Sequence, residues 1–102
     1  MKDALIVRPE AEADLAAACR WYEERSEGLG HDFLLSVEVA IEAICQNPAL
    51  CPRIHKAVRR KMIRRFPFGV FYVSEENRIT VLAVMHCRRS PDEWMKRVTK
   101  TS

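Results

Sequence analysis

The residues best suited to chemistry stand at the end of the longest hydrophobic segment of the chain. The run Val81–Met85 is typical of a buried strand, and it is followed by His86, Arg88 and Arg89. A histidine near its unperturbed pKa can transfer a proton. Guanidinium groups donate hydrogen bonds in a fixed fork that suits phosphate or carboxylate. The strand end is therefore a candidate site for an anionic partner.

Other basic and aromatic residues are expected to contribute to this site. The segment Val58–Phe66 is strongly basic, and a short terminal segment begins at Pro91. If the later strands form a meander, His86 and Arg88 lie close to part of the basic segment. The candidate binding residues are Arg59, Arg64, Arg65, Tyr72, His86, Arg88, Arg89, Trp94 and Arg97.

Each candidate also has a structural interpretation. His86 would cap the strand by a hydrogen bond to neighbouring backbone, and Trp94 would form a lid over the core. Tyr72 would be a strand residue with a satisfied hydroxyl, while Arg64 and Arg65 on an edge strand would deter aggregation. The sequence contains no Ser-His-Asp order, paired carboxylates, Gly-rich phosphate loop or HExxH motif. The residues alone therefore specify no reaction.

The four cysteines and the N-terminus exclude several other classes of protein. A metal site would have to combine Cys45, Cys51, His55 and Cys87, but zinc sites usually contain closely spaced ligand pairs and no CxxC pair occurs. We expect reduced structural cysteines, no metal and no cofactor. The apolar run Ala4–Val7 is too short for a signal-peptide core or a membrane span. We therefore expect a cytoplasmic protein without a membrane partner.

Charge is divided unequally along the chain. Residues 1–50 contain 4 Lys/Arg and 10 Asp/Glu, a net charge of −6, whereas residues 51–102 contain 13 and 4, a net charge of +9. Such asymmetry indicates a basic surface for an anionic partner, either nucleic acid or an acidic protein segment. The alternative is a solvated basic face without a partner.

The first half of the sequence predicts a strand and two helices. Ala4–Val7 is the strand, and Pro9 suits the first turn of a helix that ends near Ser26. Acidic residues near the start of this helix favour its dipole; they are Glu10, Glu12 and Asp14. The second helix ends at Asn47-Pro48. Its apolar stripe has helical spacing and consists of Phe33, Leu34, Val37, Ala40, Ile41, Ile44 and Cys45.

The second half predicts three strands. Val58–Phe66 is the first, Pro67-Phe68-Gly69 forms the tight connection to Val70–Val73, and Ile79–Met85 follows after a turn. Alternation would place Val81, Ala83 and Met85 on one face of the last strand and Leu82 and Val84 on the other. Because both faces are apolar, this strand is expected to lie centrally.

The predicted fold class is α+β, with the order β-α-α-β-β-β in a single domain over residues 1–102. A helical hairpin packs on one face of a mostly antiparallel sheet, because neither layer can bury its apolar face alone. A short C-terminal segment completes the fold.

Five segments in series resemble the RelE/ParE superfamily of bacterial toxin–antitoxin toxins. They are VRPEAEADL, WYEERSEGLGHDF, QNPALCPR, RRFPFGVFYV and ITVLAVMHCRRSPDEWMKR, and together they span nearly the whole chain. The resemblance implies the same β-α-α-β-β-β fold. It also implies a cognate antitoxin, encoded beside the toxin, that neutralises it in a hetero-oligomeric complex.

Within the superfamily, the C-terminal pattern resembles the ParE branch. ParE-like members inhibit DNA gyrase, whereas RelE-like members cut mRNA on the ribosome without a metal. A RelE-like member would more often carry an Arg and then a Tyr beyond the last strand, and no Tyr follows Tyr72. The leading expectation is a toxin of a type II (plasmid stabilisation) module that poisons gyrase. The binding candidates above would then meet the target or the antitoxin.

Two alternatives remain open. One is a RelE-like endoribonuclease, in which His86 with Arg64, Arg65 and Arg88 would supply acid–base chemistry and charge stabilisation at phosphate. The other is a non-toxic descendant that binds its partner and harms nothing.

Overall fold

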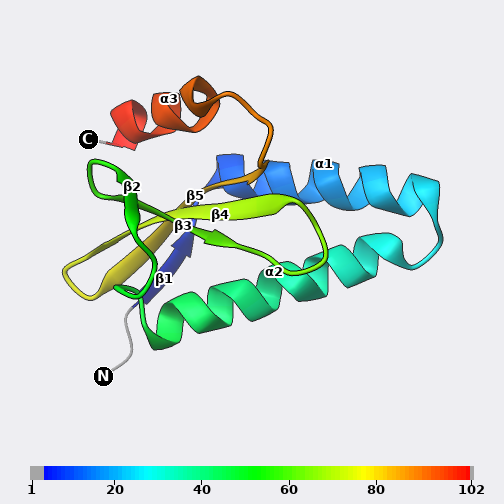
Figure 1. Ribbon diagram of the computed structural model, residues 1–102, viewed down its shortest axis with the longest axis horizontal. Coiled ribbons are helices and arrows are strands. Elements are labelled where there is room, and N and C mark those ends of the chain that lie inside the picture. Colours follow the sequence, from blue (N-terminus) through cyan, green and yellow to red (C-terminus); the bar gives the residue numbers. More distant parts are fainter. Residues whose placement is uncertain (1–3, 102) are drawn as a thin grey trace.

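Five strands form one sheet, with two helices on one face and a third helix on the other (Figure 1). The computed structural model of the protein describes residues 4–101. The elements are β1 (Ala4–Val7), α1 (Pro9–Arg25), α2 (Leu29–Gln46), β2 (Arg53–His55), β3 (Val58–Met62), β4 (Phe68–Glu75), β5 (Arg78–His86) and α3 (Pro91–Thr101).

The sheet has the strand order β1-β5-β4-β3-β2. β1 pairs with β5 in parallel, and the remaining pairs are antiparallel. The meander β3-β4-β5 and the central place of β5 are therefore confirmed. β2 was not predicted, because three residues directly after Pro52 are too few to show an alternating pattern.

Each face of the sheet carries its own apolar cluster. The hairpin of α1 and α2 covers a cluster that includes Val70, Val81 and Val84. On the opposite face, α3 covers a cluster that includes Leu82 and Trp94. Both faces of β5 are thus buried, as its composition predicted.

A β-bulge changes which residues of β5 share a face. Tyr72 pairs with Val81 and Phe71 with Ala83, so Leu82 is an extra residue in β5. A bulge interrupts the alternation of side chains. Simple alternation placed Val81 with Ala83 and Met85, and this was wrong. Val81 lies with Val84 on the hairpin face, while Ala83, Met85 and Leu82 lie on the α3 face.

The apolar stripe of α2 packs against the sheet as predicted, except that Leu34, at its border, is exposed. Phe33, Val37 and Ile44 are fully buried, whereas Ile41 at the edge of the stripe is partly buried. The helix ends at Gln46, directly before Asn47 and Pro48. Burial of this stripe is what fixes the helical hairpin to the sheet.

The connection between β3 and β4 begins earlier than predicted. β3 ends at Met62, and Phe68 already belongs to β4. Arg64 and Arg65 therefore lie in the connection, where Arg65 adopts a positive φ of 73°. They were expected on an edge strand, but β3 lies inside the sheet between β4 and β2. Pro67 ends the connection, where its missing N–H interrupts no ladder.

The turn between α1 and α2 depends on Glu23. Its Oε2 accepts a hydrogen bond from the N–H of Gly28 at 2.9 Å, and its Oε1 accepts one from the N–H of Gly30 at 3.0 Å. Gly28 has a φ of 86°, which glycine adopts without strain. A Cβ on Gly30 would stand 2.6 Å from the carbonyl oxygen of Cys19, so the two helices approach closely only because this residue is glycine. Glu23 thus stabilises the start of α2 from the end of α1.

We expect Glu23→Gln to lower the free energy of unfolding at neutral pH. The hydrogen bonds from Gly28 and Gly30 lower the pKa of Glu23 in the folded chain. Its contribution is therefore fully present above the unfolded pKa, about 4.3, and is lost as pH falls through the lower folded pKa. Urea unfolding from pH 7 to pH 3 should show the difference from wild type shrinking in acid. Glu24→Gln, which alters an exposed carboxylate 3.9 Å from Arg25, is the control. A difference that is constant with pH would contradict this role.

Candidate partner-binding surface at the end of the central strand

The C-terminal end of β5 lies beside the connection between β3 and β4. Phe68 pairs with His86, and the N–H of Cys87 donates to the carbonyl of Pro67 at 2.7 Å. Two basic segments that are distant in the sequence therefore meet at one end of the sheet. We call this surface the basic rim; it consists of Arg64, Arg65, His86, Arg88 and Arg89.

The arginines of the basic rim are exposed and only weakly held. Arg65 lies 3.6 Å from Asp32, with 61% of its side chain exposed, and Arg89 forms a 3.0 Å ion pair with Glu93. Exposed pairs of this kind contribute little to stability. Within residues 4–101, the side chains of Arg64 and Arg88 form no ion pair or hydrogen bond. Their charge is available to an anionic partner.

His86 has a structural role in the turn that follows β5. Its Nδ1 accepts a hydrogen bond from the N–H of Arg88 at 3.0 Å, and its ring lies edge-on to Phe68 with 5.3 Å between centroids. The interpretation of His86 as a cap of the strand is therefore confirmed. Nδ1 is the acceptor nitrogen in this arrangement, which leaves Nε2 to meet any external group.

Arg59 and Tyr72 lie away from the basic rim and hold the loop between α2 and β2. Arg59 donates to the carbonyl of Ala49 at 3.2 Å and also to that of Cys51. The hydroxyl of Tyr72 donates to the carbonyl of Pro48 at 2.7 Å. Burial raises the pKa of Tyr72 well above its usual range. Because its side chain is fully buried, Tyr72 is a core residue rather than a surface contact.

Trp94 and Arg97 lie on α3 and attach this helix to the rest of the fold. Trp94 is 6% exposed and stacks on Phe71 with 5.0 Å between ring centroids, so its predicted place as a lid over the core is confirmed. Arg97 donates to both carboxylate oxygens of Asp14, at 2.5 and 3.0 Å, and to the carbonyl of Leu82 at 3.2 Å. The hydrogen bond to Asp14 raises the pKa of Arg97.

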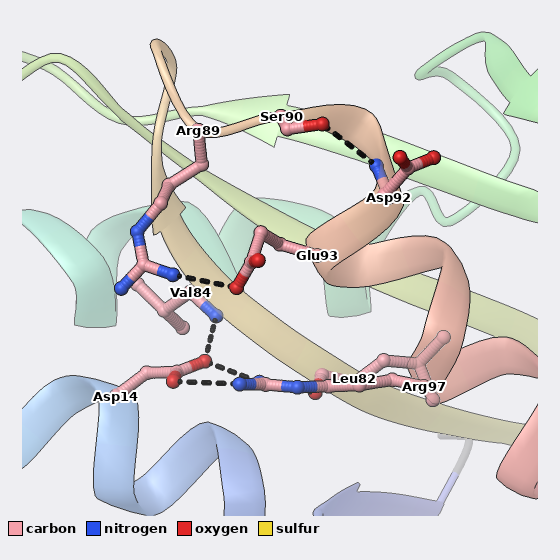
Figure 2. A network of polar contacts seen from close by, with 8 residues as sticks. All are labelled: Asp14, Leu82, Val84, Arg89, Ser90, Asp92, Glu93 and Arg97. Atoms are coloured by element: carbon pink, nitrogen blue, oxygen red, sulfur yellow. Dashed lines mark hydrogen bonds and ion pairs between the residues drawn. The ribbon is translucent and has the colours of Figure 1, made fainter.

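Asp14 is the functional residue that sequence reasoning missed. It was assigned only to the helix dipole, but its Oδ2 also accepts the N–H of Val84 at 2.9 Å (Figure 2). One carboxylate thus connects α1, β5 and α3. Asp14 is 70 residues from Val84 and 83 from Arg97, and no local pattern reports contacts over such distances.

A cleft lies between α1 and the end of β5, next to the basic rim. Its volume is about 440 Å³, and apolar residues of α1, β5 and β4 line most of it, among them Ala17, Met85 and Phe68. Arg89 also lines the cleft, as does Trp21, which is 51% exposed and stacks under the Arg25 guanidinium at 3.5 Å. Small residues on α1 leave this space open, and the alanine-rich segment AEADLAAAC was its only signal in the sequence.

The structure also bears on metals and membranes. Among the residues that the structure describes, no three His, Cys, Asp or Glu side chains are grouped closely enough to hold a metal ion. Cys19, Cys51 and Cys87 carry free thiols. No helix within residues 4–101 has both the length and the apolar character needed to cross a membrane.

Comparison with known proteins identifies the family. A sequence profile described as "ParE toxin of type II toxin-antitoxin system, parDE" matches residues 5–91, most of the chain. The chain belongs to the ParE toxin family. It is therefore a toxin of the type II toxin–antitoxin class, and the matched region includes the whole basic rim and ends as α3 begins.

A solved structure has the same fold as this ParE-family toxin. It is described as "Chromosomal ParDE TA system from P. aeruginosa", with a TM-score of 0.71 and 20% sequence identity. The likeness covers 82% of this chain and 95% of that chain. A comparison with curated protein sequences found no match.

We expect Asp14→Asn to destabilise the fold by about 1–3 kcal/mol, because hydrogen bonds to a charged group are lost in a partly buried place. The asparagine oxygen can still accept from Val84, but it no longer neutralises Arg97. Glu93→Gln, which breaks the exposed pair with Arg89, should cost at most about 1 kcal/mol. Urea midpoints at constant slope measure both changes. Equal effects of the two substitutions would show that Asp14 is not a structural anchor.

Proposed function

We propose that this ParE-family toxin halts growth by poisoning DNA gyrase in the cytoplasm, as part of a plasmid stabilisation module. The observation that supports a binding function is the exposure of the arginine side chains in the basic rim. Its arginines are exposed, and the side chains of Arg64 and Arg88 have no partner in the described part of the chain. The resemblance to the ParE branch supplies the target.

We also propose that a cognate antitoxin neutralises the toxin by covering the basic rim. The half of the chain that follows Leu50 carries a charge of +9, and complementary acidic residues on the antitoxin would accelerate and orient association. The basic rim is also continuous with the apolar cleft beside α1, since His86 and Arg89 belong to both. An antitoxin segment with both acidic and apolar residues fits this combination.

Expression of the toxin without an antitoxin should arrest growth and produce gyrase-dependent DNA breaks. Breaks are expected because a gyrase poison stabilises the cleaved enzyme–DNA complex instead of merely blocking the enzyme. Pulsed-field analysis of the chromosome measures the breaks, and a strain carrying poison-resistant gyrase is the control. Intact DNA together with transcripts cut inside codons would contradict this proposal and favour the ribonuclease alternative.

That alternative has one observation in its favour, namely that His86, Arg64, Arg65 and Arg88 gather at one end of the sheet. Undisturbed growth would favour a non-toxic descendant.

Charge reversal on the basic rim should slow association with the antitoxin. We expect the pair Arg64→Glu and Arg88→Glu to lower the association rate by about tenfold or more at low salt, because steering depends on long-range attraction. Raising the salt concentration should reduce the difference through screening. Lys56→Glu and Arg78→Glu, exposed residues at the opposite end of the strands, form the matched control. Stopped-flow or surface-binding kinetics measure both. Equal rates for the two double variants would show that the antitoxin approaches elsewhere.

A further inference from the structure

The edge of β5 is paired along only part of its length. β1 is four residues long and pairs with Arg78–Val81, whereas β5 continues to His86. Beyond Val81, no strand of residues 4–101 lies on that side of β5. The backbone groups of its last five residues on that edge must therefore bond to something else or stay open.

The ladder with β4 shows which groups face this edge. Phe68 donates its N–H to the carbonyl of Phe66 and accepts at its carbonyl from Ile63, so its partner residue His86 does not bond to β4. In an antiparallel pair, bonded and non-bonded pairs alternate. The backbone groups of His86 and of Val84, two residues earlier, consequently face outward, away from β4.

The fold itself satisfies most of these outward groups. Asp14 accepts the N–H of Val84, Arg97 donates to the carbonyl of Leu82, and Arg89 donates its N–H to the carbonyl of His86. Two groups remain. Among the described residues, neither the carbonyl of Val84 nor the N–H of His86 has a hydrogen-bond partner.

The two open groups have the arrangement that one residue of a parallel strand requires. In a parallel ladder a residue donates to the carbonyl before its opposite neighbour and accepts from the N–H after it. Opposite Met85, these are the carbonyl of Val84 and the N–H of His86. An antiparallel strand would instead need both groups of one residue, and Asp14 and Arg89 each already bond to one of them.

The space beside this edge fits an extended peptide with apolar side chains. The 440 Å³ cleft runs along Val84, Met85 and His86, and its opposite wall is the small-residue face of α1 that includes Ala17. A parallel segment would run toward the basic rim, so its following residues would reach Arg88 and Arg89. Acidic residues at that end complete the match.

We infer that an extended segment of the antitoxin adds to β5 opposite Met85, parallel to it and in line with β1. Apolar side chains of the segment enter the cleft, and acidic residues that follow meet the basic rim. This inference rests on the proposed neutralisation by an antitoxin and specifies where, and in which direction, the antitoxin binds.

Amide exchange tests the inference directly. The probe is the purified protein encoded by the reading frame beside the toxin, added to ¹⁵N-labelled toxin. The His86 amide should exchange rapidly in the free chain and at least about a hundredfold more slowly in the complex, as a ladder hydrogen bond would require. A complex in which the His86 amide stays unprotected, for example one with a helix in the cleft, overturns the inference.

Two matched pairs of variants test the same contact by affinity. His86→Pro removes the open N–H without breaking the β4 ladder, and His86→Ala removes only the imidazole. The proline variant should bind the antitoxin roughly three- to tenfold more weakly than the alanine variant, because one hydrogen bond is lost.

The second pair of variants tests the cleft. Ala17→Leu fills the cleft and should weaken binding by about tenfold or more. Ala16→Leu, on an exposed position of α1 outside the cleft, should leave binding unchanged.

The outcomes separate this inference from the proposed function. If the antitoxin does not bind the wild-type toxin, the proposed neutralisation fails. If it binds and all four variants retain wild-type affinity, neutralisation stands and strand addition at β5 is overturned. Thermal unfolding of each variant confirms that the compared chains are folded, and the exchange experiment on the wild type decides the matter if the proline variant is not.

Discussion

The Asp14 carboxylate is the interaction on which the arrangement of the three layers depends. It accepts a backbone hydrogen bond from β5 and a two-pronged contact from Arg97 on α3, while its own residue belongs to α1 (Figure 2). A partly buried carboxylate destabilises the fold unless it is hydrogen-bonded and ion-paired. Loss of either the Val84 N–H or the Arg97 guanidinium would therefore leave the charge of Asp14 incompletely compensated. The contact fixes α1 against β5 on one side and holds α3 over the opposite face. The cleft, the open strand edge and the basic rim all lie next to this point.

The basic residues of the second half divide into two groups with different tasks. Arg59 and Arg97 are turned inward and bond to backbone carbonyls, so their charge serves the fold. The side chains of Arg64 and Arg88 are exposed, and within residues 4–101 they form no ion pair or hydrogen bond. The surplus of positive charge that a partner meets is therefore concentrated at one end of the sheet. A partner that binds at that end would also contact an apolar cleft. These apolar contacts add specificity, which electrostatic attraction alone does not supply.

The short β1 connects the fold to its proposed mode of neutralisation. The chain enters α1 directly after Arg8, so β1 does not cover the end of β5. The side chains of Asp14 and Arg97 and the backbone N–H of Arg89 satisfy all but two of the outward groups there. Because most backbone groups on this edge of β5 already have hydrogen-bond partners, the edge is protected against non-specific pairing with other strands. It still offers one defined bridge to a segment that carries the right side chains. Toxicity and its neutralisation would then use neighbouring surfaces, so that a bound antitoxin also covers the residues that meet the target.

The sequence by itself determined the parts of this protein that depend on local pattern. The stripe of Phe33, Val37 and Ile44 specified α2, the two-sided apolar run specified a central β5, and Pro67 marked the connection before β4. It also separated the acidic half from the basic half and carried the ParE resemblance. Tertiary structure alone decided which basic residues reach the surface, because Arg59, Arg64 and Arg97 look alike in the sequence and differ only in the distant carbonyls and carboxylates that they meet. The bulge at Leu82 and the anchoring by Asp14 belong to the same class, since each depends on register and on contacts between residues far apart in the chain, where periodicity carries no information.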